Sequence, residues 1–552
     1  MNQPAESPLP RNHVFPHALI DAFHRQPDTA AFEHRGRAVP RHEVLDRAAR
    51  CVRGLRAAGI GPGSSVAVAA GVTPETFALH LAVHLLGARL TGLRPGLPSR
   101  HLAQILSDGI DVLVHDEPSG TPELFTAAGD LGRLRLEKDL LSTAVAASPD
   151  DLVPRGRPDD IALITLTSGS TGQPKRCAHT YRSLSASWSW QPDRWTARTS
   201  ALAAAYARFL LFGTLTSAVI FEHLGLCLLG GGTAVIPDPP PSFPEVFARH
   251  RITACLLTVP RLYHILDTLR TEPVDTSSLR ALLVAGSPLA PHRLAEATER
   301  LGPVVHQGYG QTETGMLTLL TPDDLAQGPR SAHGTVGRPL DGVEIDVRDP
   351  DGGQPPADGA TGEIWVRTAG ALAGYWHDEA ETRAVLRDGW VRTRDLGRLD
   401  EHGFLRLTGR TREVIIVNAV LHYAGAIEQA LARHPDVDQA YVVSAPDERT
   451  GEAAHAFVVP TAQRRPDPAA LRTHVAAELG PASVPATITV IAEVPVAGSG
   501  KPDKRALLGL VGGGGPVGGG GSVGGAAGGG GPAGDGDAVG DGGPAGGAVR
   551  SG

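Results

Sequence analysis

The sequence LTSGSTGQPKRCAHT, at residues 166–180, decides how the chain is interpreted. The apolar run at 161–167 predicts a buried β-strand that leads directly into a loop of glycine and hydroxyl residues. Glycines let a backbone wrap closely around an anion, and the N–H and hydroxyl groups of such a loop donate hydrogen bonds without steric bulk. Lys175 adds a positive charge at the end of the loop. The stretch therefore suits a phosphate group, with a surface turn as the alternative on these residues alone.

Two well-known loop types do not fit this stretch. The P-loop spacing G-x-x-x-x-G-K-[ST] is absent, and Ser170 is not part of a G-x-S-x-G turn that would make it a nucleophile. The interpretation of the loop therefore depends on the rest of the chain.

Strand and helix patterns continue on both sides of the loop. Residues 40–145 alternate helical stretches, such as HEVLDRAARCVRGLRAAG, with short apolar runs, such as SSVAVAA. This alternation is typical of strands joined by crossover helices. Further apolar runs that end near Gly, Ser or Pro lie at 161–167, 232–236, 252–259 and 280–285. We therefore predict an α/β fold whose layered subdomains form one large domain.

The pattern changes in the last third of the chain. Between about 335 and 407, short alternating runs with turn residues predict a small β-rich subdomain. Residues 408–508 alternate strand and helix patterns and predict a compact α+β domain. Residues 509–552 are rich in glycine with almost nothing apolar to bury, so we expect a disordered tail. The predicted divisions are thus 1–407, 408–508 and 509–552.

Composition excludes several classes of protein. The formal net charge is −8, from 59 acidic and 51 basic residues that are interspersed, without the basic stripe that nucleic-acid binding needs. The four cysteines lie far apart, which predicts neither a metal pair nor a disulfide framework and fits a reducing cytoplasm. The N-terminus lacks the basic and apolar segments of a secretion signal. The most apolar region, 209–221, is shorter than the roughly 20 residues of a membrane span, so we interpret it as buried core.

STGQPK at 170–175, GYGQTETG at 308–315 and GSGKPDKR at 498–505 resemble the motifs of the adenylate-forming superfamily in order and spacing. That superfamily includes acyl-CoA ligases, nonribosomal peptide synthetase adenylation domains and firefly-type luciferases. The resemblance covers roughly residues 20–508, and YARFLLFGTLTSAVIF at 206–221 is similar to benzoate-type CoA ligases. It implies that ATP and Mg²⁺ are used to convert a carboxylic acid to an acyl-adenylate, whose acyl group then passes to coenzyme A.

The resemblance also implies a nucleotide site. Tyr309 would bury the adenine against an aromatic face, and the hydroxyl of Thr312 would donate to the α-phosphate. Asp395 would accept hydrogen bonds from both ribose hydroxyls, with Arg410 as its companion. The predicted cofactor-binding residues are Thr167, Ser168, Gly169, Ser170, Thr171, Gly172, Lys175, Tyr309, Gly310, Thr312, Asp395, Arg410 and Lys501.

Three residues are implied to be catalytic: Thr171, Glu313 and Lys501. Glu313 is the predicted ligand of Mg²⁺, which prefers hard oxygen ligands such as carboxylates. Lys501 lies on a glycine-rich arm, and its ammonium would offset the repulsion between the carboxylate of the acid and the α-phosphate. The stretch 410–413, with Arg412 at the hinge position, implies that the small domain rotates between two half-reactions.

Several positions depart from the superfamily's pattern. Arg176 and Arg394 stand where glycine is common, and Asn418 and Ala419 occupy the place of a glycine pair that lines the pantetheine tunnel. The acyl acceptor therefore has alternatives to coenzyme A, namely the pantetheine of a carrier protein acting in trans, or an amine. A further alternative is a non-catalytic protein that binds an adenylate.

The acid itself is expected to bind beside the nucleotide. In the superfamily's amino-acid-activating domains an aspartate in the corresponding helix pairs the substrate ammonium, and AAAYARFLLFGT at 203–214 has none. The resemblance therefore favours an aromatic or short hydrophobic acid over an α-amino acid. Arg208 is either a partner for a second polar group of the acid or a solvent-facing residue. The predicted acid-pocket residues are Tyr206, Phe209, Phe212, Gly213, Gly286, Ser287, Gln307 and Gly308.

Overall fold

The computed structural model describes residues 14–142, 148–167, 175–238, 240–349, 359–411, 413–417, 420–462, 464–497 and 500–511. The predicted loop residues Ser168, Gly169, Ser170, Thr171 and Gly172 lie outside these ranges. So do Arg412, Asn418, Ala419 and residues 512–552 of the predicted tail.

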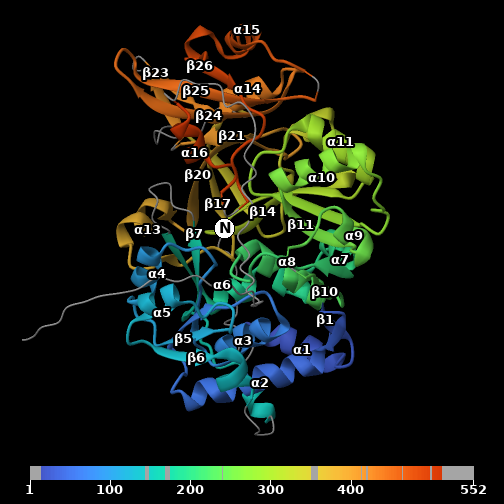
Figure 1. Cartoon of the computed structure of the whole chain (residues 1–552), viewed down its shortest axis with the longest axis vertical. Helices are drawn as coiled ribbons and strands as arrows, with labels where there is room; N and C mark the ends of the chain where they lie inside the picture. The colour runs from blue at the N-terminus through green and yellow to red at the C-terminus, as the bar shows by residue number, and fades with distance from the viewer. Residues whose placement is uncertain are drawn as a thin grey trace, which may run out of the picture. The chain divides into compact units, whose positions relative to one another are not determined.

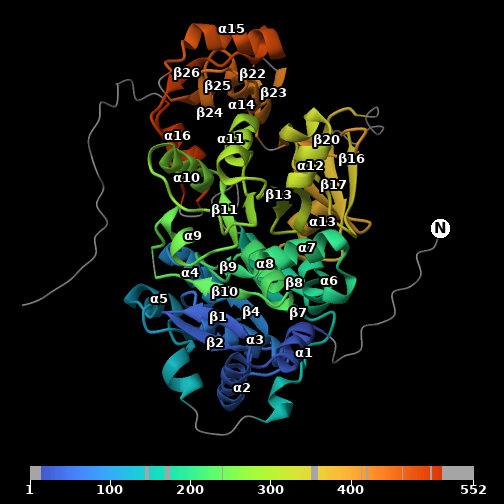
Figure 2. The ribbon, with the colours of Figure 1, turned by 90° about the vertical axis from the view of Figure 1, so that its right-hand side faces the viewer.

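Two large sheets form the layers of the N-terminal part (Figures 1 and 2). Sheet one has the order β18-β8-β7-β4-β3-β5-β6, with β3 Ser65–Ala69, β4 Arg89–Gly92, β5 Val112–His115, β6 Gly132–Arg135, β7 Ile161–Thr167, β8 Lys175–Thr180 and β18 Gly374–Tyr375. Sheet two has the order β15-β14-β13-β12-β11-β9-β10-β1-β2, with β1 Ala30–His34, β2 Arg37–Pro40, β9 Arg208–Leu210, β10 Thr233–Ile236, β11 Ala254–Thr258, β12 Ala281–Ala285, β13 Val305–Gln311, β14 Gly315–Leu320 and β15 Arg338–Pro339.

Helices cover these sheets and connect their parallel strands. They are α1 His17–Arg25, α2 Arg41–Ala57, α3 Pro74–Leu85, α4 Ser99–Leu106, α5 Pro122–Ala128, α6 Tyr181–Ala186, α7 Ala197–Ala205, α8 Ala218–Leu229, α9 Glu245–Arg249, α10 Val259–Thr271, α11 Pro291–Leu301, α12 Pro322–Gln327 and α13 Glu379–Val385. Figures 1 and 2 both show α10 near β11, and α11 packs against α10 and β13.

The sequence of β12 shows how the layers arise. Leu282 and Val284 pack into the core formed with α9, α10 and α11, whereas Ala281 and Leu283 pack into the core shared with sheet one, α3 and α8. Because successive side chains of a strand point to opposite faces, a continuous apolar run serves a strand that is covered on both sides. On sheet one, α4 and α5 cover the face opposite the shared core. The predicted α/β layers are therefore confirmed.

Two smaller sheets complete the chain. Sheet three contains β16 Glu344–Arg348, β17 Gly362–Arg367, β19 Leu386–Arg387, β20 Trp390–Leu399 and β21 Leu405–Arg410. Sheet four contains β22 Val414–Val417, β23 Val420–Tyr423, β24 Val437–Asp447, β25 Gly451–Pro460 and β26 Thr487–Val490, with helices α14 Ala424–Ala432, α15 Pro468–Leu479 and α16 Lys504–Gly509. The fold class is thus as predicted, a large N-terminal domain followed by a small α+β domain. The boundary between 407 and 408 stays a prediction.

The apolar region 209–221 spans β9, a connecting turn and the start of α8. In the ranges that the structure describes, no helix has both the length and the apolar character needed to cross a membrane.

One buried ion pair connects the small domain to the large one. The guanidinium of Arg293 on α11 donates to both carboxylate oxygens of Asp438 on β24, at 2.6 Å each. His292 Nε2 lies 2.9 Å from Asp438 Oδ1. The side chains of Arg293 and Asp438 are 4% and 6% exposed. Burial would raise the pKa of Asp438, but the hydrogen bonds from His292 and Arg293 outweigh it and hold that pKa at about 2.

We expect Asp438 to make the stability of the protein depend on acidity below pH 4. A carboxyl whose pKa is lowered by folding stabilises the folded state above its ordinary pKa near 4 and loses that contribution as the pH falls toward 2. The difference corresponds to about 2 kcal/mol. Urea unfolding at pH 5 and pH 2.5 should show that Asp438→Asn is less stable than wild type at pH 5 and loses less stability on acidification. Equal losses in the two proteins would contradict this prediction.

Candidate active site

The residues predicted to contact the ribose lie opposite one another in sheet three. β20 and β21 are antiparallel, and their register pairs Asp395 with Arg410. The Nε–H of Arg410 donates to Asp395 Oδ1 at 2.8 Å. The Asp395 side chain is only 5% exposed, whereas that of Arg410 is 58% exposed. The carboxylate is therefore held at the base of the site while its cation faces solvent.

The motif at 308–315 contacts the other oxygen of the same carboxylate. The hydroxyl of Tyr309, on β13, donates to Asp395 Oδ2 at 2.7 Å, and Gln311 Nε2 donates to that oxygen at 2.6 Å. Burial and the neighbouring Asp395 raise the pKa of Tyr309 well above its ordinary value, so the phenol stays protonated and remains a donor. Because a carboxylate has about four acceptor positions, these three donors leave Asp395 with capacity for a ligand hydroxyl. Gln311 was not among the predicted site residues, although it lies inside the quoted motif.

Glu313 and Lys175 belong to a second network, built around sheet one. The hydroxyl of Tyr375, on β18, donates to Glu313 Oε1 at 2.7 Å, and the ammonium of Lys175 lies 5.0 Å from the centre of the Tyr375 ring. Lys175 also forms an ion pair with Glu381 at the start of α13. The lysine that closes the phosphate loop is thus placed near the predicted metal ligand.

Arg394 shares Glu381 with Lys175 and has a left-handed backbone, with φ +61°. Glycine adopts this conformation without steric cost, which explains why glycine is common there and why an arginine is strained. Burial would raise the pKa of Glu381, but hydrogen bonds from Arg394 and Lys175 outweigh it and hold the pKa at about 2. Glu381 and Tyr375 escaped the sequence analysis because nothing in their local sequence marks them.

Lys501 lies on a short hairpin that contacts the large domain. A β-bridge joins Val496 to Pro502, and the N–H of Ala497 donates to the carbonyl of Lys501 at 2.8 Å. At the adjacent end of sheet two, a Cβ placed on Gly286 would be 3.2 Å from Cε of Lys501. Gly286 follows β12 and has φ +96°, so a glycine at this position serves both the turn and the close approach of the lysine.

The ammonium of Lys501 is electrostatically coupled to the site. Part of Lys501 is exposed to solvent, but protein atoms surround much of its side chain. The resulting desolvation is the main reason why the pKa of Lys501 is lowered. Arg410 lowers the pKa further, while Asp395 and Glu313 raise it. The residues of the 308–315 motif, the Asp395–Arg410 pair and Lys501 therefore converge on one region.

The remaining predicted residues divide into two groups. Thr167 pairs with Lys175 across the two strands that flank the phosphate loop, and the carbonyl of Thr312 accepts from His179 Nε2 at 3.0 Å. Gly310 pairs with Met316 in the β13–β14 hairpin. The predicted acid-pocket residues Tyr206, Phe209, Phe212, Gly213, Gln307 and Gly308 lie on or beside β9 and β13, and Gly286 and Ser287 follow β12.

Two of these aromatic residues are fully buried in the shared core. Tyr206 and Phe209 stack with their ring centres 5.1 Å apart, and both have almost no exposed surface. Phe212 packs against Phe243 on the opposite side of the sheet. The glycines Gly286 and Gly308 are therefore better placed to border a ligand than these rings are, because they lie at the strand ends next to Lys501 and the motif.

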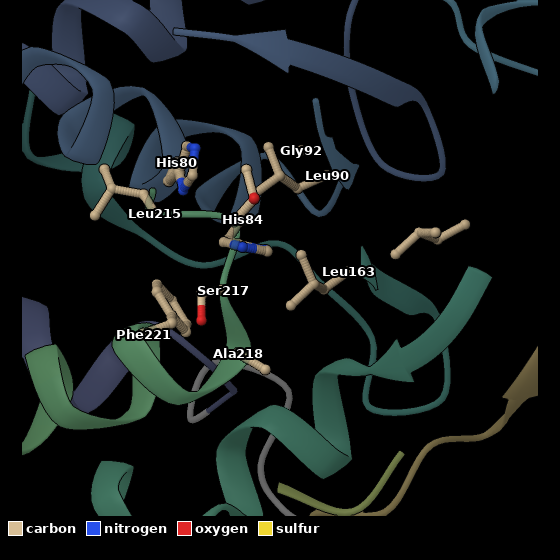
Figure 3. A pocket seen from close by; sticks show the side chains of 11 residues that line it. His80, His84, Leu90, Gly92, Leu163, Leu215, Ser217, Ala218 and Phe221 are labelled. Carbon is tan, nitrogen blue, oxygen red and sulfur yellow. The ribbon is translucent and has the colours of Figure 1, made fainter. Parts of the chain in front are cut away.

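A narrow pocket lies where α3 and the start of α8 approach sheet one (Figure 3). His80 and His84 from α3, Ala218 and Phe221 from α8, and Ser217 immediately before α8 line it. Burial lowers the pKa of His84 to about 3, so that ring is neutral at pH 7, and neither ring nitrogen has a hydrogen-bond partner among the described residues. The space holds about one water molecule, and none of the predicted site residues lines it.

We expect Tyr375 to set the strength of metal binding at Glu313. Removing the hydroxyl that hydrogen-bonds a carboxylate ligand commonly weakens metal affinity by about tenfold or more. Tyr375→Phe should therefore raise the Mg²⁺ concentration needed for half-maximal pyrophosphate release by about tenfold. Tyr441→Phe, which removes a hydroxyl that donates to Gln439 in the small domain, is the matched control. If both variants show the Mg²⁺ dependence of the wild type, Tyr375 has no role at the metal.

Comparisons with known proteins agree with this arrangement. A family model described as AMP-binding enzyme matches residues 19–376, and one described as AMP-binding enzyme C-terminal domain matches 426–501. The medium/long-chain-fatty-acid–CoA ligase FadD8 of Mycobacterium tuberculosis is 30% identical, with 89% of each chain covered. Feruloyl-CoA synthase of Amycolatopsis sp. is 32% identical, with 86% of this chain and 94% of that protein covered. The solved structure of the amide bond synthetase McbA from Marinactinospora thermotolerans is 33% identical, with a TM-score of 0.77 and coverage of 89% of this chain and 99% of that one. The chain therefore belongs to the AMP-binding enzymes of the adenylate-forming superfamily, in the acyl-CoA ligase branch.

Proposed function

We propose that this enzyme activates a carboxylic acid with ATP and transfers the acyl group to coenzyme A. The observation that carries the proposal is the position of Lys501 against Gly286, together with its electrostatic coupling to Arg410, Asp395 and Glu313. A cation at this point lies where an acid carboxylate and an α-phosphate would meet.

In the first half-reaction, a carboxylate oxygen of the acid attacks the α-phosphorus of ATP. The bond from that phosphorus to the bridging oxygen breaks, and pyrophosphate leaves. The ammonium of Lys501 offsets the repulsion between the two anions as they approach, which is the kind of preorganised stabilisation that lowers a barrier most. Thr171 and Lys175 act on the phosphates, and Asp395, Arg410 and Tyr309 hold the nucleoside.

Magnesium would be held by Glu313 together with phosphate oxygens. Among the residues that the structure describes, no group of three metal-ligating side chains lies close enough to bind a metal unaided. One protein carboxylate plus substrate phosphates is a common way to bind this ion, so Glu313 fits it. The bound ion neutralises phosphate charge.

In the second half-reaction, the sulfur of coenzyme A attacks the acyl carbon, the bond to the AMP oxygen breaks, and the thiol proton passes to solvent. We propose that a rotation of the small domain about 410–413 separates this step from the first. The Arg293–Asp438 pair would then open and close with each turnover. The relative that is a feruloyl-CoA synthase supports an aromatic acid, and the proposed acid remains aromatic or short and hydrophobic.

The acceptor has one specific competitor. McbA is an amide bond synthetase of the same fold, which favours an amine as the second candidate acceptor, and a carrier protein acting in trans is a third. The four cysteines are all buried and unpaired, which agrees with the proposed cytoplasmic location.

The test is acid-dependent pyrophosphate release, measured with and without coenzyme A across benzoates, cinnamates, short fatty acids and amino acids. Lys501→Ala should lower the rate of release by about a hundred- to a thousandfold, because one stabilising charge is removed from the transition state. Lys138→Ala, at an exposed lysine outside the site, should retain the wild-type rate.

Mass spectrometry of the products identifies the acceptor. Formation of the acyl-CoA with an aromatic or short acid supports the proposal. Pyrophosphate release without any acyl-CoA would show that coenzyme A is not the acceptor and would favour an amine or a carrier protein. A full rate in Lys501→Ala would overturn the role of the lysine.

A further inference from the structure

Glu222, on α8, is a buried carboxyl group with an unused oxygen. The residue is 8% exposed. Its Oε1 accepts from Ser187 Oγ at 3.4 Å, and the backbone N–H of Met316 lies close enough to the carboxyl group to lower its pKa. Its Oε2 has no hydrogen-bond partner among the described residues. Burial raises the pKa of Glu222 to about 7, against the effect of these donors.

The carboxyl group lies against the hairpin that carries the active-site motif. A Cβ on Gly315 would clash with Oε1 of Glu222, so the glycine is what admits this side chain. Met316, the next residue, pairs with Gly310, and its sulfur would be 3.1 Å from a Cβ on Gly308. Glu222 therefore packs on the same hairpin as Gly308, where the acid is proposed to bind.

A further buried polar atom, the indole N–H of Trp188, lies close to this carboxyl group. The indole N–H of Trp188 is close enough to lower the pKa of Glu222 but makes no well-formed hydrogen bond to any described residue. The ring of His223 lies 5.5 Å from that of Trp188; its Nδ1 is 2.8 Å from the Tyr206 hydroxyl, and its Nε2 has no partner in the described part of the chain. Buried polar groups are nearly always paired, so the Glu222 oxygen and the adjacent Trp188 N–H, neither of which makes a well-formed hydrogen bond to a described residue, indicate a polar ligand.

Space for a ring exists next to the indole of Trp188. Trp188, rather than Glu222 itself, borders a cavity of about 250 Å³. Leu202, Leu319, Pro339 and Leu340 form its apolar walls, and Thr196, Arg198, Thr199 and Asp341 are its polar lining residues. Apolar walls with a few polar groups are typical of small-molecule sites. The pocket in Figure 3 is a separate one. Phe221, immediately before Glu222, lines it together with His80 and His84, but Glu222 does not.

We propose that Glu222 accepts a hydrogen bond from an N–H or O–H group at the non-reacting end of the acid, so that the natural substrate is a hydroxylated or N–H-bearing aromatic acid rather than a plain hydrocarbon acid. The inference rests on the proposed function and narrows its substrate class. Glu222 is a specificity-determining residue in this role and takes no part in the bond changes at the α-phosphorus. Its unpaired oxygen gains a partner only when the correct acid binds, and a site with an unpaired polar group discriminates strongly against analogues that lack the donor.

The experiment uses two pairs of acids that differ only by a methyl group on the donor. They are indole-3-acetate with 1-methylindole-3-acetate, and 4-hydroxycinnamate with 4-methoxycinnamate. Calorimetric Kd values and kcat/KM for pyrophosphate release are measured for wild type, Glu222→Gln, which keeps an acceptor oxygen, and Glu222→Met, which does not. Glu299→Gln, at an exposed position of α11, is the matched control.

Wild type and the control should prefer the unmethylated acid of at least one pair by about tenfold. In Glu222→Met the preference should disappear. Kd and KM for the unmethylated acid should rise while kcat changes little, because a contact made equally before and during the reaction is removed. Glu222→Gln should keep part of the preference. An unchanged preference in Glu222→Met, or none in wild type, overturns the inference.

Two readouts separate this inference from the proposed function. The shift of the thermal midpoint by ATP reports folding and nucleotide binding, and it should be equal in all variants. Should Glu222→Met fail to fold, the wild-type and Glu222→Gln preferences decide. If acids bind with the expected preference but no pyrophosphate forms, the inference about Glu222 stands and the proposed reaction fails. If pyrophosphate forms without any preference between the acids, the proposed reaction stands and the inference about Glu222 fails.

Discussion

The nucleotide side of this enzyme depends on one buried carboxylate. Asp395 receives hydrogen bonds from Tyr309 and Gln311 on β13 and from Arg410 on β21, so three strands from two sheets meet at a single charge. An unpaired carboxylate at this depth would be very unfavourable, and each donor is therefore constrained by the need to satisfy it. The same constraint places the 308–315 motif beside sheet three. The hairpin of Lys501 enters next to this region, where the field of Asp395 and Glu313 acts on its ammonium.

Much of this arrangement was predictable from the sequence because the residues proposed to bind phosphate, ribose and metal are concentrated in short motifs. The apolar run 161–167, the glycine-rich loop and the hairpin arm at Lys501 each have a composition that indicates their structure. The partners of these residues were not predictable. Tyr375, on a two-residue strand, lies 62 residues from Glu313, and Glu381, on a short helix, lies 206 residues from Lys175. Only the folded chain brings them to Glu313 and Lys175.

The acid pocket shows the same difference more strongly. The resemblance assigned Tyr206 and Phe209 to the acid pocket by their place in the superfamily's pocket-lining stretch, and the fold stacks the two rings in the core between the sheets, so their role stays a prediction. Sequence reasoning passed over Glu222, since a glutamate in an apolar helix gives no sign of the direction in which it points. The sequence shows that an arginine, Arg394, stands where glycine is common in the superfamily. It does not show that Glu381 forms ion pairs with both Arg394 and Lys175.

The Arg293–Asp438 pair has a consequence for the timing of the reaction. Two parallel hydrogen bonds between buried charges exchange for hydration only when water reaches both groups, so separating them is slow relative to breaking a surface ion pair. If the small domain rotates after adenylation, this pair sets a dwell time during which the acyl-adenylate is sheltered. Arg293 keeps Asp267 and Glu296 as partners after separation, at 3.0 and 3.1 Å, whereas Asp438 keeps no cation on its own strand. The energetic cost of opening therefore falls mainly on the small domain. Substitutions at position 438 would change how long the acyl-adenylate persists before it reacts with an acceptor.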